Sequence, residues 1–229
     1  MTEELKTARP CRLTDPEGVY LLLDAALPRV YAGLLRGGEW LALESSAEPA
    51  AEGLFDAVER GLNRAAITLE GVAGYLFCEG PGSILGMRIA SMAIRTWRGY
   101  HPGRPVPCLA YRNLELLGTA LLESGRTPPF GVLSDARRGH WNFLEINGKG
   151  DPAPLRRVPD EQVETAVIPL WRPDEAPIAR PPARDVSSIP YDLAPAAPWF
   201  YRHPLLRTVA EPEPLVLGAP EYRKWPGRL

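Results

Sequence analysis

Cysteine and histidine are scarce in this chain, which contains three residues of each type among 229. The cysteines stand far apart, at positions 11, 78 and 108, and their number is odd. This spacing argues against a disulfide framework and favours reduced thiols. Metal sites need ligands clustered at defined intervals, and neither the cysteines nor the isolated histidines form such a cluster. We therefore expect no metal site.

A strong charge imbalance and long apolar runs are also missing. The 28 acidic residues nearly balance the 26 lysines and arginines, which leaves a net charge of −2. Composition therefore predicts no bulk attraction to nucleic acid. No apolar run reaches the length of a membrane span, and residues 1–10 lack the apolar core of a signal peptide. We expect a cytoplasmic protein that does not contact membranes.

The order of apolar runs predicts an α/β protein with two lobes. Strands are expected at 19–23, 30–35, 39–43 and 72–78, and helices at 50–66 and 83–99. This βββαβα order favours layers of helices on a sheet. A further strand at 106–109, a helix at 113–123 and strands near 130–135 and 140–146 should follow.

Changes in amino-acid composition along the sequence suggest where the chain divides into lobes. We expect an N-terminal extension over residues 1–17, an N-terminal lobe over 18–104 and a C-terminal lobe over 105–229. The C-terminal lobe becomes rich in proline after residue 150, with 16 of the 26 prolines. Proline opposes long helices and central strands, so this part should be irregular, with long surface loops.

A glycine-rich turn joins the strand at 72–78 to the helix at 83–99. Its marked residues are Gly80, Pro81, Gly82, Ser83, Gly86 and Arg88. Glycine permits close backbone approach, and serine is a good N-cap for the helix that follows. A helix start can also bind an anion, so the turn is either a phosphate cradle or a tight structural turn. The local chemistry favours the structural turn.

The helix at 83–99 is apolar over more than half of its circumference. Such a helix is either an internal core helix or covered by a partner. With one face of the preceding helix it gives a predicted docking surface, composed of Leu54, Val58, Leu85, Ile89, Ala90, Ala93, Ile94 and Trp97.

Two acidic positions deserve separate interpretations. Asp24 ends the first strand, but Ala25 and Ala26 follow it and supply no hydroxyl to hold a phosphate or a metal-bound water. The segment Asp135-Ala136-Arg137-Arg138-Gly139 lies between two expected strands. It is either a solvated, charged hairpin or a fixed polar platform in which Asp135, Arg137 and Arg138 face a cleft.

Two segments together resemble the bacterial TsaB (YeaZ-like) proteins. The first, from Gly80 to Ile89, is similar to the family's Gly-Pro-Gly-Ser-Phe-Thr-Gly-Leu-Arg-Ile signature. The second, Asp135 to Gly139, is similar to an Asp-Ala-Arg-Arg-Gly stretch that the family carries about fifty residues later. The order and the spacing both fit, and the resemblance covers residues 18–148.

This resemblance implies an actin/Hsp70-like ATPase fold (ribonuclease H-like) and a role in making threonylcarbamoyl-adenosine in tRNA. In that pathway the family resembles a non-catalytic scaffold that pairs with its catalytic paralogue TsaD through the first lobe, with the ATPase TsaE completing the set. The chain would need no cofactor of its own, because ATP is used by the partner complex. It would meet tRNA only indirectly and form a homodimer when alone.

Departures from the family keep an alternative open. The family's Asp-Thr-Ser turn is Asp24-Ala25-Ala26 here, and its Phe-Thr pair is Ile84-Leu85. The paralogue's His-x-x-x-His metal pair corresponds to the stretch from Asn113 to Leu117, which has no histidine. The chain resembles a divergent pseudo-enzyme. The alternative is a nucleotide-binding ATPase or small kinase of the same fold, with Gly80–Ser83 and Asp24 as its minimal site.

Overall fold

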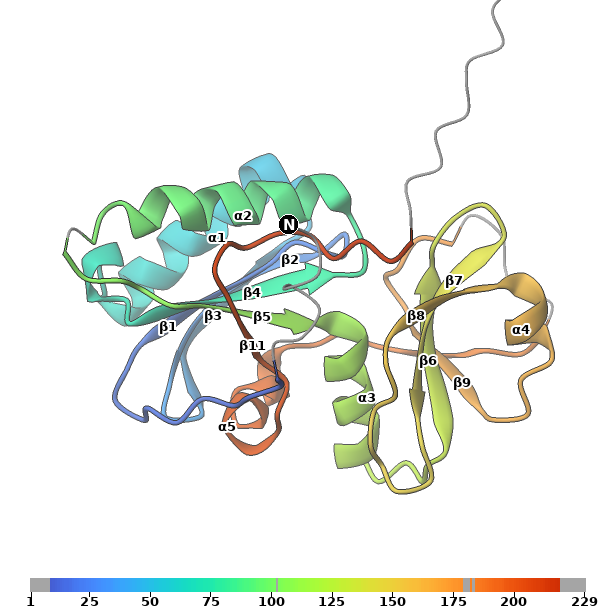
Figure 1. The fold of residues 1–229 in the computed structure, drawn as a ribbon. Coiled ribbons are helices and arrows are strands. Elements are labelled where there is room, and N and C mark those ends of the chain that lie inside the picture. Colours follow the sequence, from blue (N-terminus) through green and yellow to red (C-terminus); the bar gives the residue numbers. More distant parts are fainter. Residues whose placement is uncertain (1–8, 102, 179–181, 183, 219–229) are drawn as a thin grey trace, which may run out of the picture.

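The structure, a computed structural model, describes residues 9–101, 103–178, 182 and 184–218. Residues 1–8 of the predicted N-terminal extension, which spans 1–17, lie outside the described part. The chain builds two sheets with helices packed around them (Figure 1). This is a mixed α/β fold, as the sequence predicts.

The first sheet has six strands in the order β11-β5-β4-β1-β2-β3. Its strands are β1 (Tyr20–Asp24), β2 (Val30–Arg36), β3 (Glu39–Ser46), β4 (Gly74–Gly80), β5 (Cys108–Arg112) and β11 (Arg207–Val209). Strand β1 is buried at every position and pairs in parallel with β4 and antiparallel with β2. Its Tyr-Leu-Leu-Leu-Asp sequence is the near-continuous apolar run that a central strand covered on both faces requires.

Two long helices cover one face of this sheet, as Figure 1 shows. They are α1 (Ala50–Ala65) and α2 (Ile84–Arg98). Helix α1 ends where Ala66 adopts a left-handed conformation, with φ of 52°. The turn between β2 and β3 uses Gly37 and Gly38, both with positive φ, as a hairpin turn demands. The predicted βββαβα start is confirmed.

The second sheet has five strands in the order β10-β9-β6-β7-β8. They are β6 (Phe130–Asp135), β7 (His140–Ile146), β8 (Arg156–Pro159), β9 (Leu170–Pro173) and β10 (Ser187–Ile189). Strands β6, β7 and β8 are antiparallel neighbours, while β6, β9 and β10 run parallel. This repeats the arrangement of β1 to β5, so one strand pattern occurs twice. Short elements after residue 150 match the expected effect of proline.

The described residues form three further α-helices, α3 (Asn113–Glu123), α4 (Asp160–Glu164) and α5 (Trp199–Arg202), and two short 3-10 helices, η2 (Leu69–Gly71) and η3 (Ala194–Ala196). Helix α3 contacts β4 and β5 of the first sheet and β6 and β7 of the second, so it lies between the two sheets (Figure 1). Among the helices of the described residues, none combines the length and apolar character needed to cross a bilayer.

The first sheet extends beyond the residue range predicted for the N-terminal lobe. Strands β5 and β11 both lie after residue 104 in the chain, yet they pair beside β4. The division at residue 104 stays a prediction. The main core spans both sheets, and a smaller cluster on the second sheet gathers Leu133, Trp141, Phe143, Val158, Val163 and Leu170.

Candidate functional site

The glycine turn forms the junction between β4 and α2. The Ser83 hydroxyl accepts a hydrogen bond from the Gly86 amide at 3.2 Å, which confirms Ser83 as the N-cap. Pro81 is buried, and its carbonyl accepts a hydrogen bond from the Asn113 amide nitrogen at 2.8 Å. Asn113 starts α3, so the turn is tied to the helix between the sheets. Arg88, one turn into α2, is exposed.

The turn packs backbone to backbone against the loop that follows β1. A Cβ atom at Gly82 would overlap the carbonyl of Ala26, and one at Gly86 would overlap the carbonyl of Ala25. The Ser83 amide donates to the Ala26 oxygen at 2.8 Å. The Ser83 amide is one of the donors that a phosphate oxygen would bind at a helix start, and here the Ala26 carbonyl already accepts its hydrogen bond. This contact favours the structural interpretation of the turn.

Asp24, at the end of β1, is fully buried and held by three hydrogen bonds. The hydroxyls of Tyr111 and Tyr191 donate to its Oδ2 at 2.7 Å and 2.6 Å. The amide of Ala26 donates to its Oδ1 at 3.0 Å. We call Asp24, Tyr111 and Tyr191 the Asp24 clasp. Its geometry satisfies both carboxylate oxygens with groups of the protein itself.

The clasp draws together distant parts of the chain. Tyr111 belongs to β5, whereas Tyr191 follows β10 of the second sheet, and the backbone oxygen of Tyr191 accepts a bond from the Tyr31 hydroxyl at 2.9 Å. Burial, and then the nearby Asp24 carboxylate, raise the pKa values of Tyr111 and Tyr191 well above the usual value. Burial likewise raises the pKa of the Cys78 thiol beside Asp24. Neutral donors thus surround one acidic group.

The Asp135–Gly139 segment is the turn between β6 and β7. Arg137 and Arg138 are exposed, and both adopt left-handed backbone conformations with φ of 65° and 54°. The Asp135 carboxylate accepts a hydrogen bond from the Arg137 amide at 2.6 Å, which fixes the turn. The exposure of both arginines agrees with the solvated hairpin. Two consecutive left-handed residues make this a strained turn. The fixed polar platform facing a cleft stays a prediction.

Five members of the predicted docking surface are core residues, so their assignment to a surface is wrong. Leu54 and Val58 of α1, and Ala90, Ala93 and Ile94 of α2, are at most 5% exposed within the single chain. The physical reason is that α2 packs against β1 and β4 on one side and against α1 on another. The apolar residues of α2 are therefore buried in two contacts inside the chain, one with the sheet and one with α1.

The remaining members do reach the surface. Leu85 is 70% exposed, while Ile89 and Trp97 are half-buried. Met92, which the sequence interpretation left out, is 66% exposed. Leu85, Ile89 and Met92 are spaced at i, i+4 and i+7, so they share one face of α2. We call these three residues the α2 stripe. Phe55 of α1, 44% exposed, packs edge-on against Trp97 nearby.

Solved structures identify the fold that carries these features. YeaZ from Pseudomonas aeruginosa superposes with a TM-score of 0.64 and 22% identity, over 87% of this chain and 100% of that one. The chain has the fold of YeaZ. An uncharacterized protein with similarity to peptidase YeaZ from Pseudomonas aeruginosa matches with a TM-score of 0.57 and 23% identity, over 76% of this chain and 86% of that one.

The YeaZ likeness agrees with the resemblance that the two sequence motifs carry. No protein-family model and no curated protein matches the chain. Within the described residues of this YeaZ-like chain, no group of three or more His, Cys, Asp or Glu side chains could hold a metal ion.

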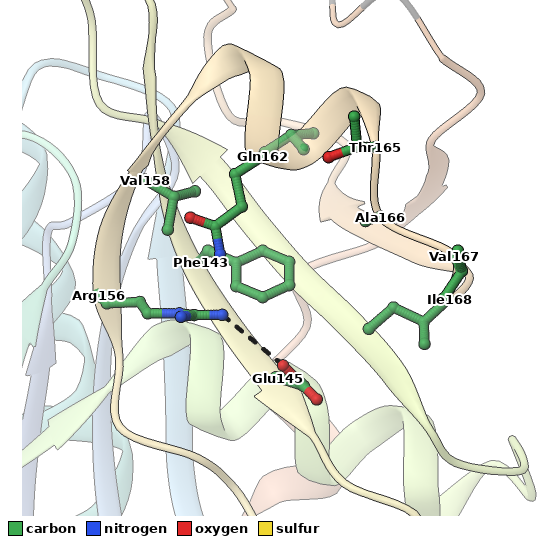
Figure 2. Close-up of a pocket in the computed structure, with 10 residues that line it drawn as sticks. Phe143, Glu145, Arg156, Val158, Gln162, Thr165, Ala166, Val167 and Ile168 are labelled. Atoms are coloured by element: carbon green, nitrogen blue, oxygen red, sulfur yellow. Dashed lines mark ion pairs between the residues drawn. The ribbon is translucent and has the colours of Figure 1, made fainter.

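A hollow that sequence reasoning missed lies on the outer side of the second sheet, with a volume of about 310 Å³ (Figure 2). Figure 2 shows the Phe143 ring at its floor, the Arg156–Glu145 ion pair on one side and Ile168 near the opposite rim. None of the sequence-predicted site residues lines it. The available signal in the sequence was the apolar run before Pro169, because Ala166, Val167 and Ile168 of that run line the hollow.

Proposed function

We propose that this chain is a non-catalytic scaffold of the complex that makes threonylcarbamoyl-adenosine in tRNA, where it pairs with a TsaD-like catalytic subunit. The YeaZ fold and the two TsaB-like motifs support the choice of pathway. The observation that carries the pairing is the α2 stripe, because its most prominent side chains, Leu85 and Met92, are exposed on a helix that is otherwise well packed.

The fold supports an actin/Hsp70-like ATPase ancestry for the scaffold. In the first sheet the antiparallel strands β1, β2 and β3 are followed, on the free side of β1, by the parallel strands β4 and β5. In the second sheet β6, β7 and β8 are followed in the same way by β9 and β10, so the pattern occurs twice in the chain.

The Asp24 clasp supports the absence of catalysis. In the alternative function, an ATPase or small kinase, Asp24 would hold a metal-bound water and the glycine turn would hold phosphate. Here two tyrosine hydroxyls bond to Asp24, and the Ala26 carbonyl takes the Ser83 amide. Replacing these contacts with a metal and a phosphate would break bonds to buried groups, which costs about 1–3 kcal/mol for each group left unsatisfied.

In the proposed complex, a TsaE-like ATPase hydrolyses ATP and the TsaD-like paralogue transfers the threonylcarbamoyl group. The α2 stripe, with Phe55 beside it, provides an apolar centre, and Arg88 and Arg95 on the same helix provide a polar rim. Stable protein interfaces commonly have this arrangement. In the absence of its partner, a second copy of the chain would cover the stripe and give a homodimer.

Co-purification with the TsaD-like paralogue from the same organism tests the pairing. Leu85→Glu and Met92→Glu each place a charge on the α2 stripe, and both positions are exposed, so the fold should survive. Val167→Glu is the matched control, because Val167 is also exposed but lies on the second sheet's side of the molecule. We expect the stripe variants to lose the paralogue and the control to retain it. Retention by all three would place the interface elsewhere.

A further inference from the structure

The C-terminal segment forms a strap along α2. Residues 210–218, here called the strap, run beside α2 toward the second sheet (Figure 1). The Pro212 carbonyl accepts hydrogen bonds from Ser91 Oγ at 2.6 Å and from Arg95 at 3.2 Å. The Leu215 backbone amide donates to the Glu79 backbone carbonyl at 2.7 Å. Bonds to the strap's own backbone therefore fix its course in addition to any contacts of its acidic side chains.

One acidic side chain of the strap enters a basic hollow of about 340 Å³ at the end of α2. The charged residues that line it are Arg95, Arg98, Arg104 and Glu211. Glu211 forms ion pairs with Arg95 Nε at 3.2 Å and with Arg98 Nη1 at 3.6 Å, one carboxylate oxygen to each. Arg95 also pairs with Glu213 at 3.2 Å, although Glu213 does not line the hollow. Three guanidinium groups and one carboxylate line the hollow, so its lining keeps an excess of positive charge.

Arg104 is held in place by the fold. Its Nη2 donates to the carbonyls of Val72 at 2.8 Å and Glu70 at 3.3 Å, and contacts Nδ1 of His101 at 3.2 Å. His101 is buried, and its Nε2 lies 3.3 Å from the Tyr75 hydroxyl. An arginine that only keeps the surface soluble would not need these hydrogen bonds to the rest of the fold. A preorganised guanidinium is suited to carboxylate and phosphate groups, two of whose oxygens it can bind with parallel hydrogen bonds.

We propose that this hollow is a phosphate-binding site and that Glu211 is its built-in competitor. Arginine recognises carboxylate and phosphate with the same geometry, and a phosphate brings more negative charge than one carboxylate. The Glu211 side chain is 57% exposed, and Arg95 is 42% exposed, so the carboxylate can leave while the strap stays in place. Exposed ion pairs are weak, which makes the exchange accessible. This proposal does not depend on the proposed function.

The phosphate could belong to a free polyphosphate or to an RNA backbone, and two probes distinguish these sources. Inorganic pyrophosphate is titrated by calorimetry, and a short labelled single-stranded RNA is titrated by fluorescence anisotropy, both at low salt. Glu211→Gln should bind at least one probe about fivefold more tightly than the wild type, because it removes the competing charge. Pyrophosphate binding would indicate a small ligand, and binding of RNA alone would indicate a backbone phosphate.

Two matched controls separate the hollow from bulk electrostatics. Glu213→Gln removes the same charge from the same strap and also frees Arg95, but Glu213 lies outside the lining of the hollow, so it should change affinity less. In the Glu211→Gln background, Arg98→Gln should abolish the gain, whereas Arg88→Gln, on the same helix outside the hollow, should preserve it. Equal gains from both glutamate variants, or no gain for either probe with an unchanged melting temperature, would overturn the proposal.

Discussion

Tyr191→Phe tests the Asp24 clasp, because it removes one hydroxyl and leaves the ring in place. The hydroxyl donates to Asp24 Oδ2 at 2.6 Å, and Asp24 is fully buried, so water cannot replace the lost bond freely. A hydrogen bond to a charged group contributes about 1.5–3 kcal/mol. In a protein of this size each kcal/mol shifts the melting temperature by about 2–4 °C, so we expect a decrease of about 3–12 °C.

Tyr31→Phe is the matched control for this experiment. It also removes one buried tyrosine hydroxyl from the same cluster, but that hydroxyl donates to a neutral carbonyl, the backbone oxygen of Tyr191. Neutral bonds contribute about 0.5–1.5 kcal/mol, so the control should cost less. Differential scanning calorimetry of both variants gives the comparison. A loss in Tyr191→Phe no larger than that in Tyr31→Phe would refute the account of a charged, buried carboxylate held by tyrosines.

Three further predictions follow from local geometry. Gly82→Ala should destabilise the fold by about 1–3 kcal/mol in chemical denaturation, since its Cβ would overlap a backbone carbonyl, whereas Gly148→Ala meets open space and should be near neutral. Leu54→Ala should cost about 2–5 kcal/mol as a core deletion, while Leu85→Ala at the surface should change stability by less than about 0.5 kcal/mol. Burial, and then nearby acidic groups, raise the pKa of Tyr31 from 10.0 to about 12, so its contribution to stability should be complete below pH 10.0 and decrease as pH rises to about 12, as seen in alkaline melting curves.

The sequence predicted the elements well where local signals were strong. The helix expected at 113–123 has those bounds in the structure, and the N-cap at Ser83 is confirmed. The docking surface was predicted less well, because periodicity shows which residues are apolar but not which neighbour buries them. Ala90 and Ile94 face internal contacts of α2, whereas Met92 reaches the surface.

Long-range features could not be predicted from the sequence. The Asp24 clasp joins residues 167 positions apart, and neither tyrosine stands in a motif that marks it as a partner of the carboxylate. The repeated strand order could not be predicted either. The first sheet has the long helix α1 after its third strand, but the second sheet has only the short α4 at that place, so the two halves give different sequence patterns. Glu211 and the arginines of α2 meet only because β11 returns the chain to the first sheet.

The threonylcarbamoyl-adenosine content of tRNA tests the scaffold proposal most directly. The native gene is depleted in the source cells, the chain or its Leu85→Glu variant is supplied in its place, and the nucleoside is quantified by mass spectrometry of digested tRNA. The account predicts that depletion lowers the nucleoside, that the wild-type chain restores it and that Leu85→Glu does not. An unchanged nucleoside level after depletion would contradict the proposed role.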